Sequence, residues 1–536
     1  MAPQDRSRPR RWRTFLKGLV AVVVLVAVVA AVWVRGRMQG PHREYRADIE
    51  FVSEPTPEGF EVGVSARDIT PDLSKFDSWK DVDRDSRFRP DKGDTYEDRN
   101  GNGDFDFVWL GGFNINRPAQ GVNDPLWARA LAFRQGGAVV AVVSVDSIGL
   151  THERFIEPRQ ELAREFPQLK HVVFTSTHTH NAPDTMGIWS YRPIPSKFNH
   201  EYVQFVVRQA KEAVAEAIRG LRPAEATLAT ADLPPAGFVR DSRQPIVTDR
   251  VLSTARFTAA GTEETIATLV SWGNHPEAMG GDNPLVSSDF PHYLREAMER
   301  GLEGEAGMKG FGGTCVFLQG PVGGLMTPLG LEVPDRNGRD VHRTNGVGKT
   351  RALGENLALR CANLLRSPAA RPMKDHRLAV IAKSVFAPIE GTFKVPIMLG
   401  LIHPGWYDGK ARTEVGVLRV GEIVLLTIPG EIYPEIVDGG VETPEGGDFP
   451  GPAVEVPPLR QEMPGALNLV LNLANDEIGY IVPRTQWDTQ PPFTYGRKDA
   501  PYGEENSGGP DVAQVIHRES LSVLRRLKER VPSPRP

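Results

Sequence analysis

The sequence predicts an α/β protein with a mixed, partly parallel sheet core, preceded by one N-terminal transmembrane helix. Buried-strand patterns at residues 138–145 and 171–176 flank a helical pattern at 153–165. Strand, helix and strand in this order are typical of a βαβ unit with parallel strands. The second observation is an apolar run at residues 15–34, which as a helix is long enough to cross about 30 Å of hydrocarbon.

Composition and local patterns indicate one large folded body. Of 536 residues, 40% are hydrophobic and 24% are charged, which is the profile of a protein with a well-packed core. Further strands are expected at residues 266–272, 314–318, 415–419 and 423–428. Further helices are expected at residues 202–218, 291–300, 347–365 and 512–530. For Cys315 and Cys361 two buried free thiols are the simpler interpretation, and a disulfide is the alternative.

Charge and hydropathy divide the chain into segments. We expect a basic cytoplasmic leader at residues 1–14, a transmembrane anchor at 15–34, a proline-containing linker at 35–59 and the body at 60–536. Basic residues are dense before the apolar run and sparse after it, so the positive-inside rule places the body on the extracytoplasmic side of the cell membrane. A cleaved signal peptide is the alternative, although the run is long for a signal core and lacks a clean A-x-A site.

The charge distribution excludes one class of function. The formal net charge is −5, and because the first 17 residues contribute +5, the remainder carries −10. An acidic body without a basic stripe argues against binding of nucleic acid through phosphate neutralisation. Nothing in the sequence indicates an obligate protein partner.

Two histidines stand where a predicted strand ends. The strand at residues 171–176 leads into Thr177-His178-Thr179-His180-Asn181-Ala182-Pro183. Neutral imidazole is a favoured zinc ligand, and α/β proteins place their sites where strands end. This pair therefore predicts a metal site, with two solvated turn histidines as the alternative.

Other candidate residues also follow apolar runs. His275 ends an apolar strand, Glu431 comes directly after another, and Tyr480 begins a short apolar run. Imidazole nitrogen and carboxylate oxygen are both zinc ligands, whereas a tyrosine in such a run is most often part of the core. Asp289 stands at a predicted helix N-terminus, where capping is the simpler interpretation and support of a metal ligand is the alternative.

Together these motifs resemble the neutral/alkaline, non-lysosomal ceramidase family, and the resemblance extends over most of the body. It implies that residues 60–536 form a zinc-dependent hydrolase domain. The zinc ligands that it implies are His178, His275, Glu431 and Tyr480.

The resemblance also assigns residues to the substrate side. His180 matches a histidine that binds substrate beside the metal, Arg240 matches a substrate-side arginine, and Tyr502 matches a second tyrosine near the metal. One segment departs from the family, because residues 320–328 contain no serine where the family has one. The sequence therefore indicates zinc hydrolysis more strongly than ceramide specificity.

The function implied by the resemblance is that of an exported, membrane-anchored amidohydrolase that cleaves N-acyl lipids such as ceramide, a sphingolipid. Zinc lowers the pKa of a bound water to about 7, and the hydroxide attacks the amide carbonyl. His180, Arg240 or Tyr502 would stabilise the oxyanion. Three alternatives stay open: a zinc hydrolase for another amide or ester, such as an N-acyl amino acid or a cell-wall fragment; a non-catalytic tethered binding protein with the same fold; and a calcium-dependent adhesion module.

A separate loop carries oxygen-bearing side chains at every second position among glycines. It resembles the first half of an EF-hand loop, and such hard ligands suit calcium. Position 12 is Trp109 in place of the usual glutamate, so an ordinary Asx turn is the alternative. The expected calcium ligands are Asp98, Asn100, Asn102 and Asp104.

Overall fold

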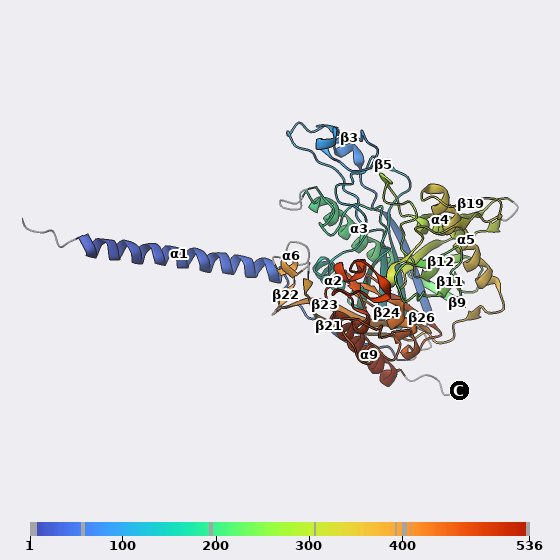
Figure 1. Ribbon diagram of the computed structural model, residues 1–536. Coiled ribbons are helices and arrows are strands. Elements are labelled where there is room, and N and C mark those ends of the chain that lie inside the picture. Colours follow the sequence, from blue (N-terminus) through green and yellow to red (C-terminus); the bar gives the residue numbers. More distant parts are fainter. Residues whose placement is uncertain are drawn as a thin grey trace, which may run out of the picture.

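Two sheets packed face to face form the centre of the protein (Figure 1). The computed structural model describes residues 8–54, 59–191, 197–304, 307–391, 394–398, 405–407 and 409–531. Within these residues the larger sheet has nine strands and the smaller has six. Helices cover the outer face of each sheet, which gives four layers in the order helix, sheet, sheet, helix.

The larger sheet runs in the order β16-β12-β11-β9-β2-β6-β7-β8, and β20 pairs with β9. Its strands are β2 (Phe60–Asp68), β6 (Trp127–Gln135), β7 (Ala138–Val145), β8 (Leu169–Ser176), β9 (Arg222–Asp232), β11 (Val251–Ala259), β12 (Thr265–Trp272), β16 (Thr314–Gln319) and β20 (Arg371–Pro372). Most neighbours are antiparallel, but β7 with β8 and β12 with β16 are parallel. The sheet curls, so that β16 at one end of the order contacts β7 and β8 at the other.

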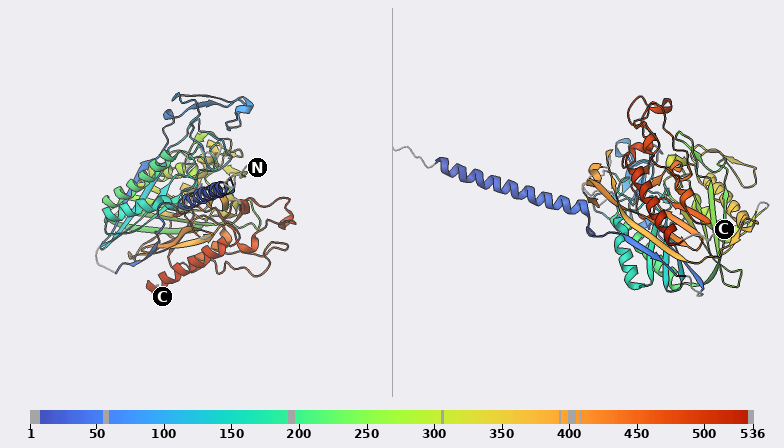
Figure 2. Two further views of the ribbon diagram at one scale, coloured as in Figure 1. Left: turned by 90° about the vertical axis from the view of Figure 1, so that its left-hand side faces the viewer. Right: turned by 90° about the horizontal axis from the view of Figure 1, so that it is seen from below.

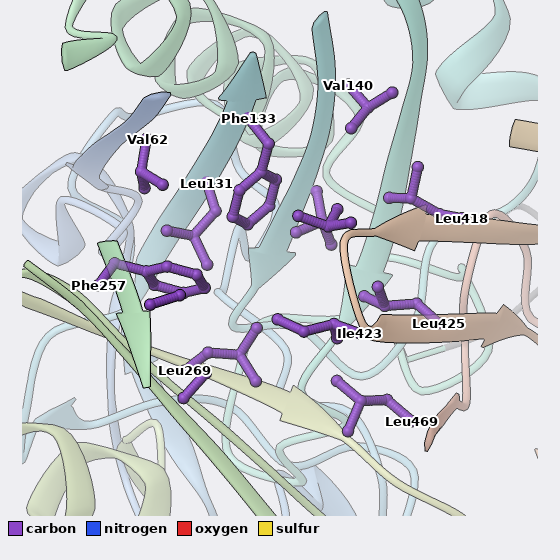
Figure 3. Packing of buried hydrophobic residues seen from close by; sticks show 14 of the residues in the cluster. Val62, Leu131, Phe133, Val140, Phe257, Leu269, Leu418, Ile423, Leu425 and Leu469 are labelled. Atoms are coloured by element: carbon purple, nitrogen blue, oxygen red, sulfur yellow. The ribbon is translucent and has the colours of Figure 1, made fainter. Parts of the chain in front are cut away.

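The smaller sheet runs in the order β1-β21-β23-β24-β26, and β22 pairs with β23. Its strands are β1 (Asp48–Val52), β21 (Leu378–Pro388), β22 (Trp406–Tyr407), β23 (Lys410–Val420), β24 (Ile423–Thr427) and β26 (Leu467–Leu471). Figure 3 shows the core between the sheets, where Leu131, Phe133 and Phe257 of the larger sheet meet Leu418 and Leu425 of the smaller. Full burial of each such side chain stabilises the fold by about 1.5–3 kcal/mol.

The helices complete the outer layers. On the larger sheet they are α2 (Glu153–Glu165), α3 (His200–Arg219), α4 (Phe290–Arg300) and α5 (Val347–Arg366), and on the smaller sheet α9 (Val512–Arg530). Strand β7, helix α2 and parallel strand β8 form the predicted βαβ unit, so the predicted mixed α/β fold is confirmed. Cys315 and Cys361 are buried free thiols, which confirms the simpler interpretation.

One long helix precedes the body and projects away from it. Helix α1 (Arg8–Gln39) projects away as a single rod, as Figures 1 and 2 show. Its residues 12–36 are apolar enough to cross a membrane, and none of the most apolar window is buried against the body. The helix is compatible with a membrane anchor or with a signal sequence.

The segment after α1 is more structured than the predicted linker at residues 35–59. Residues 48–52 are strand β1, which pairs with β21, so this part of the predicted linker belongs to the smaller sheet. The chain before β1 is also fixed to the body. The buried guanidinium of Arg412 donates to the carbonyl oxygens of His42 (2.7 Å) and Tyr45 (2.8 Å), and the Tyr407 hydroxyl donates to the carbonyl of Gln39 (3.1 Å).

Candidate metal centre

The turn after β8 places His178 in a strained conformation. His178 has φ +66°, a region that side-chain-bearing residues rarely adopt and that is frequent at functional sites. Its backbone N–H donates to the carbonyl of Ser147 at 3.0 Å, and its Nδ1 lies 2.6 Å from the carbonyl oxygen of Ile148. A carbonyl acceptor keeps the proton on Nδ1 and leaves the Nε2 lone pair free to face the site.

His275, after strand β12, repeats this arrangement. Its Nδ1 lies 2.7 Å from the carbonyl oxygen of Met326, and its Nε2 lies 3.0 Å from Oε2 of Glu431. The Nε2 of His178 lies 3.4 Å from the same carboxylate oxygen. Two imidazole lone pairs and one carboxylate oxygen therefore converge on one point, which is the donor set that a divalent metal requires.

Glu431 and Tyr480 come together through a short parallel bridge. Strand β25 (Glu431–Ile432) pairs with β27 (Tyr480–Ile481), and the register sets Glu431 directly beside Tyr480. The Tyr480 hydroxyl lies 3.5 Å from Nε2 of His275. All four residues implied as zinc ligands are buried and lie together.

His180 completes a cluster of three buried imidazoles. One ring nitrogen from each of His178, His180 and His275 lies within 4.8 Å of the others, so the group could bind a metal ion. The Nδ1 of His180 lies 3.2 Å from Oε2 of Glu277 in an ion-pair contact, and neither ring nitrogen has a hydrogen-bond partner within the described chain. A buried nitrogen without a partner is costly unless a ligand or metal satisfies it.

Gly112 is required by the position of His180. A Cβ on Gly112 would lie 2.4 Å from Cγ of His180, and the glycine has φ +96°. Because of both the close approach and the left-handed backbone, any residue other than glycine would be destabilising at this position.

The charged forms of Glu431 and His275 stabilise each other. Burial alone would lower the pKa of His275, but Glu431 and Glu277 raise it to about 9. Burial would raise the pKa of Glu431, but His178 and His275 hold it well below the usual range. Burial lowers the pKa of His180 to about 4. The buried Glu431 carboxylate is thus an anion that needs a cation beside it, either an imidazolium or a metal.

A cavity of about 230 Å³ opens beside these residues. One wall carries His178, His180, Glu431 and Tyr480, together with Tyr502, which is half exposed at the mouth and whose ring lies 6.0 Å from that of Tyr480. Most of the remaining lining is apolar and includes Phe113, Ile148, Met186, Ile188, Trp189 and Ile478. A polar end with an apolar wall fits an amphiphilic ligand.

Arg240 lies apart from the cavity. It is exposed on β10 (Arg240–Asp241), and its Nε donates to the carbonyl of Leu329 at 2.6 Å. Among the described residues it is not part of the cavity lining. The position of the Arg240 side chain therefore does not support its predicted role in substrate binding, which stays a prediction.

The serine-free segment at 320–328 packs against residues of the candidate metal centre. A Cβ on Gly323 would lie 2.5 Å from the backbone of Ile432, and a Cβ on Gly273 would lie 2.1 Å from the carbonyl oxygen of Pro321. The same segment supplies the Met326 carbonyl to His275. These close backbone contacts explain why glycine is needed at Gly323 and Gly273. The segment helps to position His275.

The loop predicted to bind calcium is an exposed Asx turn. Asp98 accepts the backbone N–H groups of Gly101 (2.7 Å) and Gly103 (2.8 Å). Side-chain amides of Asn100 and Asn102 donate to Asp106, at 2.9 and 2.7 Å, and Asp104 pairs with Lys197. This is the arrangement of the alternative interpretation, and calcium binding stays a prediction.

Sequence reasoning missed two acidic residues at the site. Glu277 pairs with His180, and Glu477 lines the cavity. Both lie in irregular segments, and only the spacing of Glu277 two residues after His275 could have pointed to it. Asp289 caps α4 through the N–H of Phe290 (2.8 Å), as predicted, and also accepts the N–H groups of Ala278 and Met279.

Comparisons with known proteins identify the fold. No protein-family model and no curated protein matches the chain. The structure of neutral ceramidase from Pseudomonas aeruginosa is similar, with a TM-score of 0.61 and 15% sequence identity over 89% of this chain and 75% of that one. A structure described as ceramidase complexed with C2 gives a TM-score of 0.62 and 15% identity over 89% and 76%. The chain therefore has the fold of the neutral ceramidases.

Proposed function

We propose that the protein is a membrane-anchored, extracytoplasmic, zinc-dependent hydrolase that cleaves the amide bond of N-acyl lipids such as ceramide. The observation that carries the proposal is the convergence of His178, His275, Glu431 and Tyr480 beside a cavity with an apolar wall. The ceramidase fold supports the same reaction, because the similar structures are those of ceramidases.

These four residues fit a zinc ion. Backbone carbonyls hold the Nδ1 atoms of His178 and His275, so that both Nε2 atoms face the carboxylate of Glu431. A metal held there would polarise the amide carbonyl and activate water. The cluster of nitrogen and oxygen donors suits zinc more than calcium or magnesium, which prefer oxygen ligands alone.

The remaining residues bind and orient the substrate. Apolar residues along the cavity would hold the acyl chain and exclude water from the reacting amide. The neutral His180 ring lines the cavity beside Glu277, and its Nε2 has no hydrogen-bond partner within the described residues. From this position the unprotonated Nε2 would take up a proton from the attacking water and then pass it to the leaving amine. Tyr502 would contact substrate at the mouth.

The test combines metal analysis with amide hydrolysis. Detergent-solubilised full-length protein should contain one zinc per chain and hydrolyse a fluorescent ceramide. We expect His178→Ala to lose the zinc and to lower kcat/KM by at least about 100-fold. The matched control is His200→Ala, an exposed histidine at the start of α3, which should change neither. Wild-type protein with bound zinc but no amidase activity would contradict the proposal and favour a binding protein.

A further inference from the structure

Arg117 is a buried cation without an anionic partner. Its side chain is fully buried, and no carboxylate of the described chain lies within ion-pair distance of it. Its Nη2 donates to the carbonyl oxygens of Gly111 (2.7 Å) and His180, and its Nη1 lies 3.5 Å from the carbonyl oxygen of Gly281. Burial of an unpaired charge costs free energy, so the role of this arginine has to be sought in the groups that it contacts.

Phe113 connects the guanidinium of Arg117 to the ring of His180. The Cζ of Arg117 lies 5.0 Å from the centroid of the Phe113 ring, which is a cation–π contact. The same ring is nearly perpendicular to the His180 imidazole, with the two centroids 4.9 Å apart. Arg117 therefore contacts both the main chain of His180 and the aromatic ring that packs against its imidazole.

The His180 imidazole has no hydrogen bond that fixes its orientation. In His178 and His275 the Nδ1 atoms contact carbonyl oxygens at 2.6 and 2.7 Å. Neither ring nitrogen of His180 has a hydrogen-bond partner among the described residues, although Nδ1 faces Glu277 at 3.2 Å. The orientation of this ring therefore depends on packing, and Phe113 supplies an aromatic surface for it.

We propose that Arg117 is a positioning residue, which holds the turn at residues 111–113 against His180 and so keeps its imidazole in the orientation that the reaction needs. This inference rests on the proposed amidase function and deepens it. Arg117 is fully buried and is not part of the described cavity lining, so it acts through His180 and not on substrate. A general base works from a fixed position, and a displacement of about 1 Å can lower the rate about 100-fold.

The first test is a double-mutant cycle on hydrolysis of the fluorescent ceramide by full-length, zinc-loaded protein. Arg117→Met keeps an apolar stem but cannot donate hydrogen bonds. We expect it to lower kcat about 100-fold, with KM and bound zinc unchanged. In a His180→Ala background the same change should lower kcat by no more than about twofold, because the residue that Arg117 positions is gone. A general loss of packing would lower kcat by similar factors in both backgrounds.

Arg117→Lys decides the question if Arg117→Met does not fold. Lysine keeps the charge and can donate to the carbonyls, but it lacks the planar fork of the guanidinium. We expect kcat to fall only about tenfold, and again to change little in the His180→Ala background. The matched control is Arg129→Lys, another buried arginine, which donates to the carbonyl of Cys315 at 2.8 Å. It should lower the midpoint of unfolding but leave kcat and KM unchanged.

A second measurement does not depend on amide cleavage. In protein whose histidines are isotope-labelled at Cε1, the NMR signal of His180 can be assigned from its absence in His180→Ala. It should shift in Arg117→Lys, whereas the signal of the exposed His200 should not. If wild-type protein cleaves no amide, the amidase proposal fails, and the NMR signal alone decides the role of Arg117. An unmoved His180 signal, or equal losses of kcat with and without His180, would overturn the inference.

Discussion

A buried ionic cluster joins β23 of the smaller sheet to α2 on the larger one, and each of its residues depends on the others. Glu414 on β23 accepts two hydrogen bonds from Arg159 (2.8 and 3.1 Å) and one from the amide of Asn475 (2.8 Å). Burial would raise the pKa of Glu414, but Arg159 and His171 hold it well below the usual range. Removal of one partner from such a buried group is strongly destabilising.

His152, beside this cluster, predicts a pH dependence of stability. Its Nδ1 lies 3.1 Å from the carbonyl oxygen of Asn475, and burial lowers its pKa to about 4. The unfolded chain binds a proton near pH 6.5 and the folded chain only near pH 4. Stability is therefore complete above pH 6.5 and falls as the pH drops toward 4, by up to about 3 kcal/mol.

Urea denaturation of full-length protein at pH 7.5, 5.5 and 4.5 measures this dependence. His152→Gln can still donate to the Asn475 carbonyl but does not titrate, so its free energy of unfolding should fall less over the same range. An identical slope for both proteins would show that the loss comes from other groups.

The sequence predicts those site residues that stand beside a local pattern. His178, His180, His275 and Glu431 follow buried strands, and strand ends are where α/β proteins place their sites. Glu477 has no such signal, because its environment is created by Glu431, 46 positions earlier along the chain. Burial, free hydrogen-bonding atoms and raised pKa values arise only when distant segments pack together.

At the scale of elements, long periodic segments are predicted well and short ones are not. Strand β7, helix α2 and strand β8 have strong apolar periodicity, and the structure places them within a few residues of the prediction. Strand β1 has only five residues, half-buried or exposed, and its sequence shows no clear alternation. Its partner β21 is more than 300 residues away, so pairing, and not local preference, makes it a strand.

Strand β1 predicts where the body can be shortened. A chain that starts at Gly40 keeps β1 and its ladder to β21, whereas one that starts at Phe60 loses both and exposes the edge of β21. We expect the shorter chain to be less stable by about 3 kcal/mol or more, because it loses ladder hydrogen bonds and the half-buried Ile49 and Phe51. Denaturation midpoints of the two chains measure the difference.

The control for this comparison is Glu50→Ala in the longer chain. Glu50 forms ion pairs with Arg526 and Arg530 of α9 on the surface. Such pairs contribute at most about 1 kcal/mol, so the variant should lose far less than the truncated chain. Equal losses would assign the effect to the ion pairs and not to the strand.

At the scale of the whole molecule, the sequence predicts that strands and helices form layers, but not how the layers curve and pack against one another. The apolar faces of the strands and helices indicate a large core, and the N-terminal run indicates the projecting helix. The curl of the larger sheet, which brings β16 against β8, has no local signal, because it results from packing of whole layers. Because His178 follows β8 and His275 follows β12, the neighbour of β16, this curl helps to bring the two histidines together.

Helix α1 gives a prediction about localisation. If it is an uncleaved anchor, the full-length protein should stay with the membrane fraction after alkaline carbonate extraction, and intact mass should include residues 1–39. The chain from Gly40 should be released. Recovery of a mature protein that lacks α1 would show that the segment is a signal sequence and would contradict the anchor.

The bonded segment between α1 and β1 has a mechanical consequence for an anchored enzyme. The carbonyls of Gln39, His42 and Tyr45 are each held by a body side chain, so little loose chain is left to act as a swivel. With α1 in a bilayer, the body has little freedom to rotate relative to the membrane or to move away from it. If α1 spans a bilayer, the cavity is held at a nearly fixed height and tilt above the lipid surface.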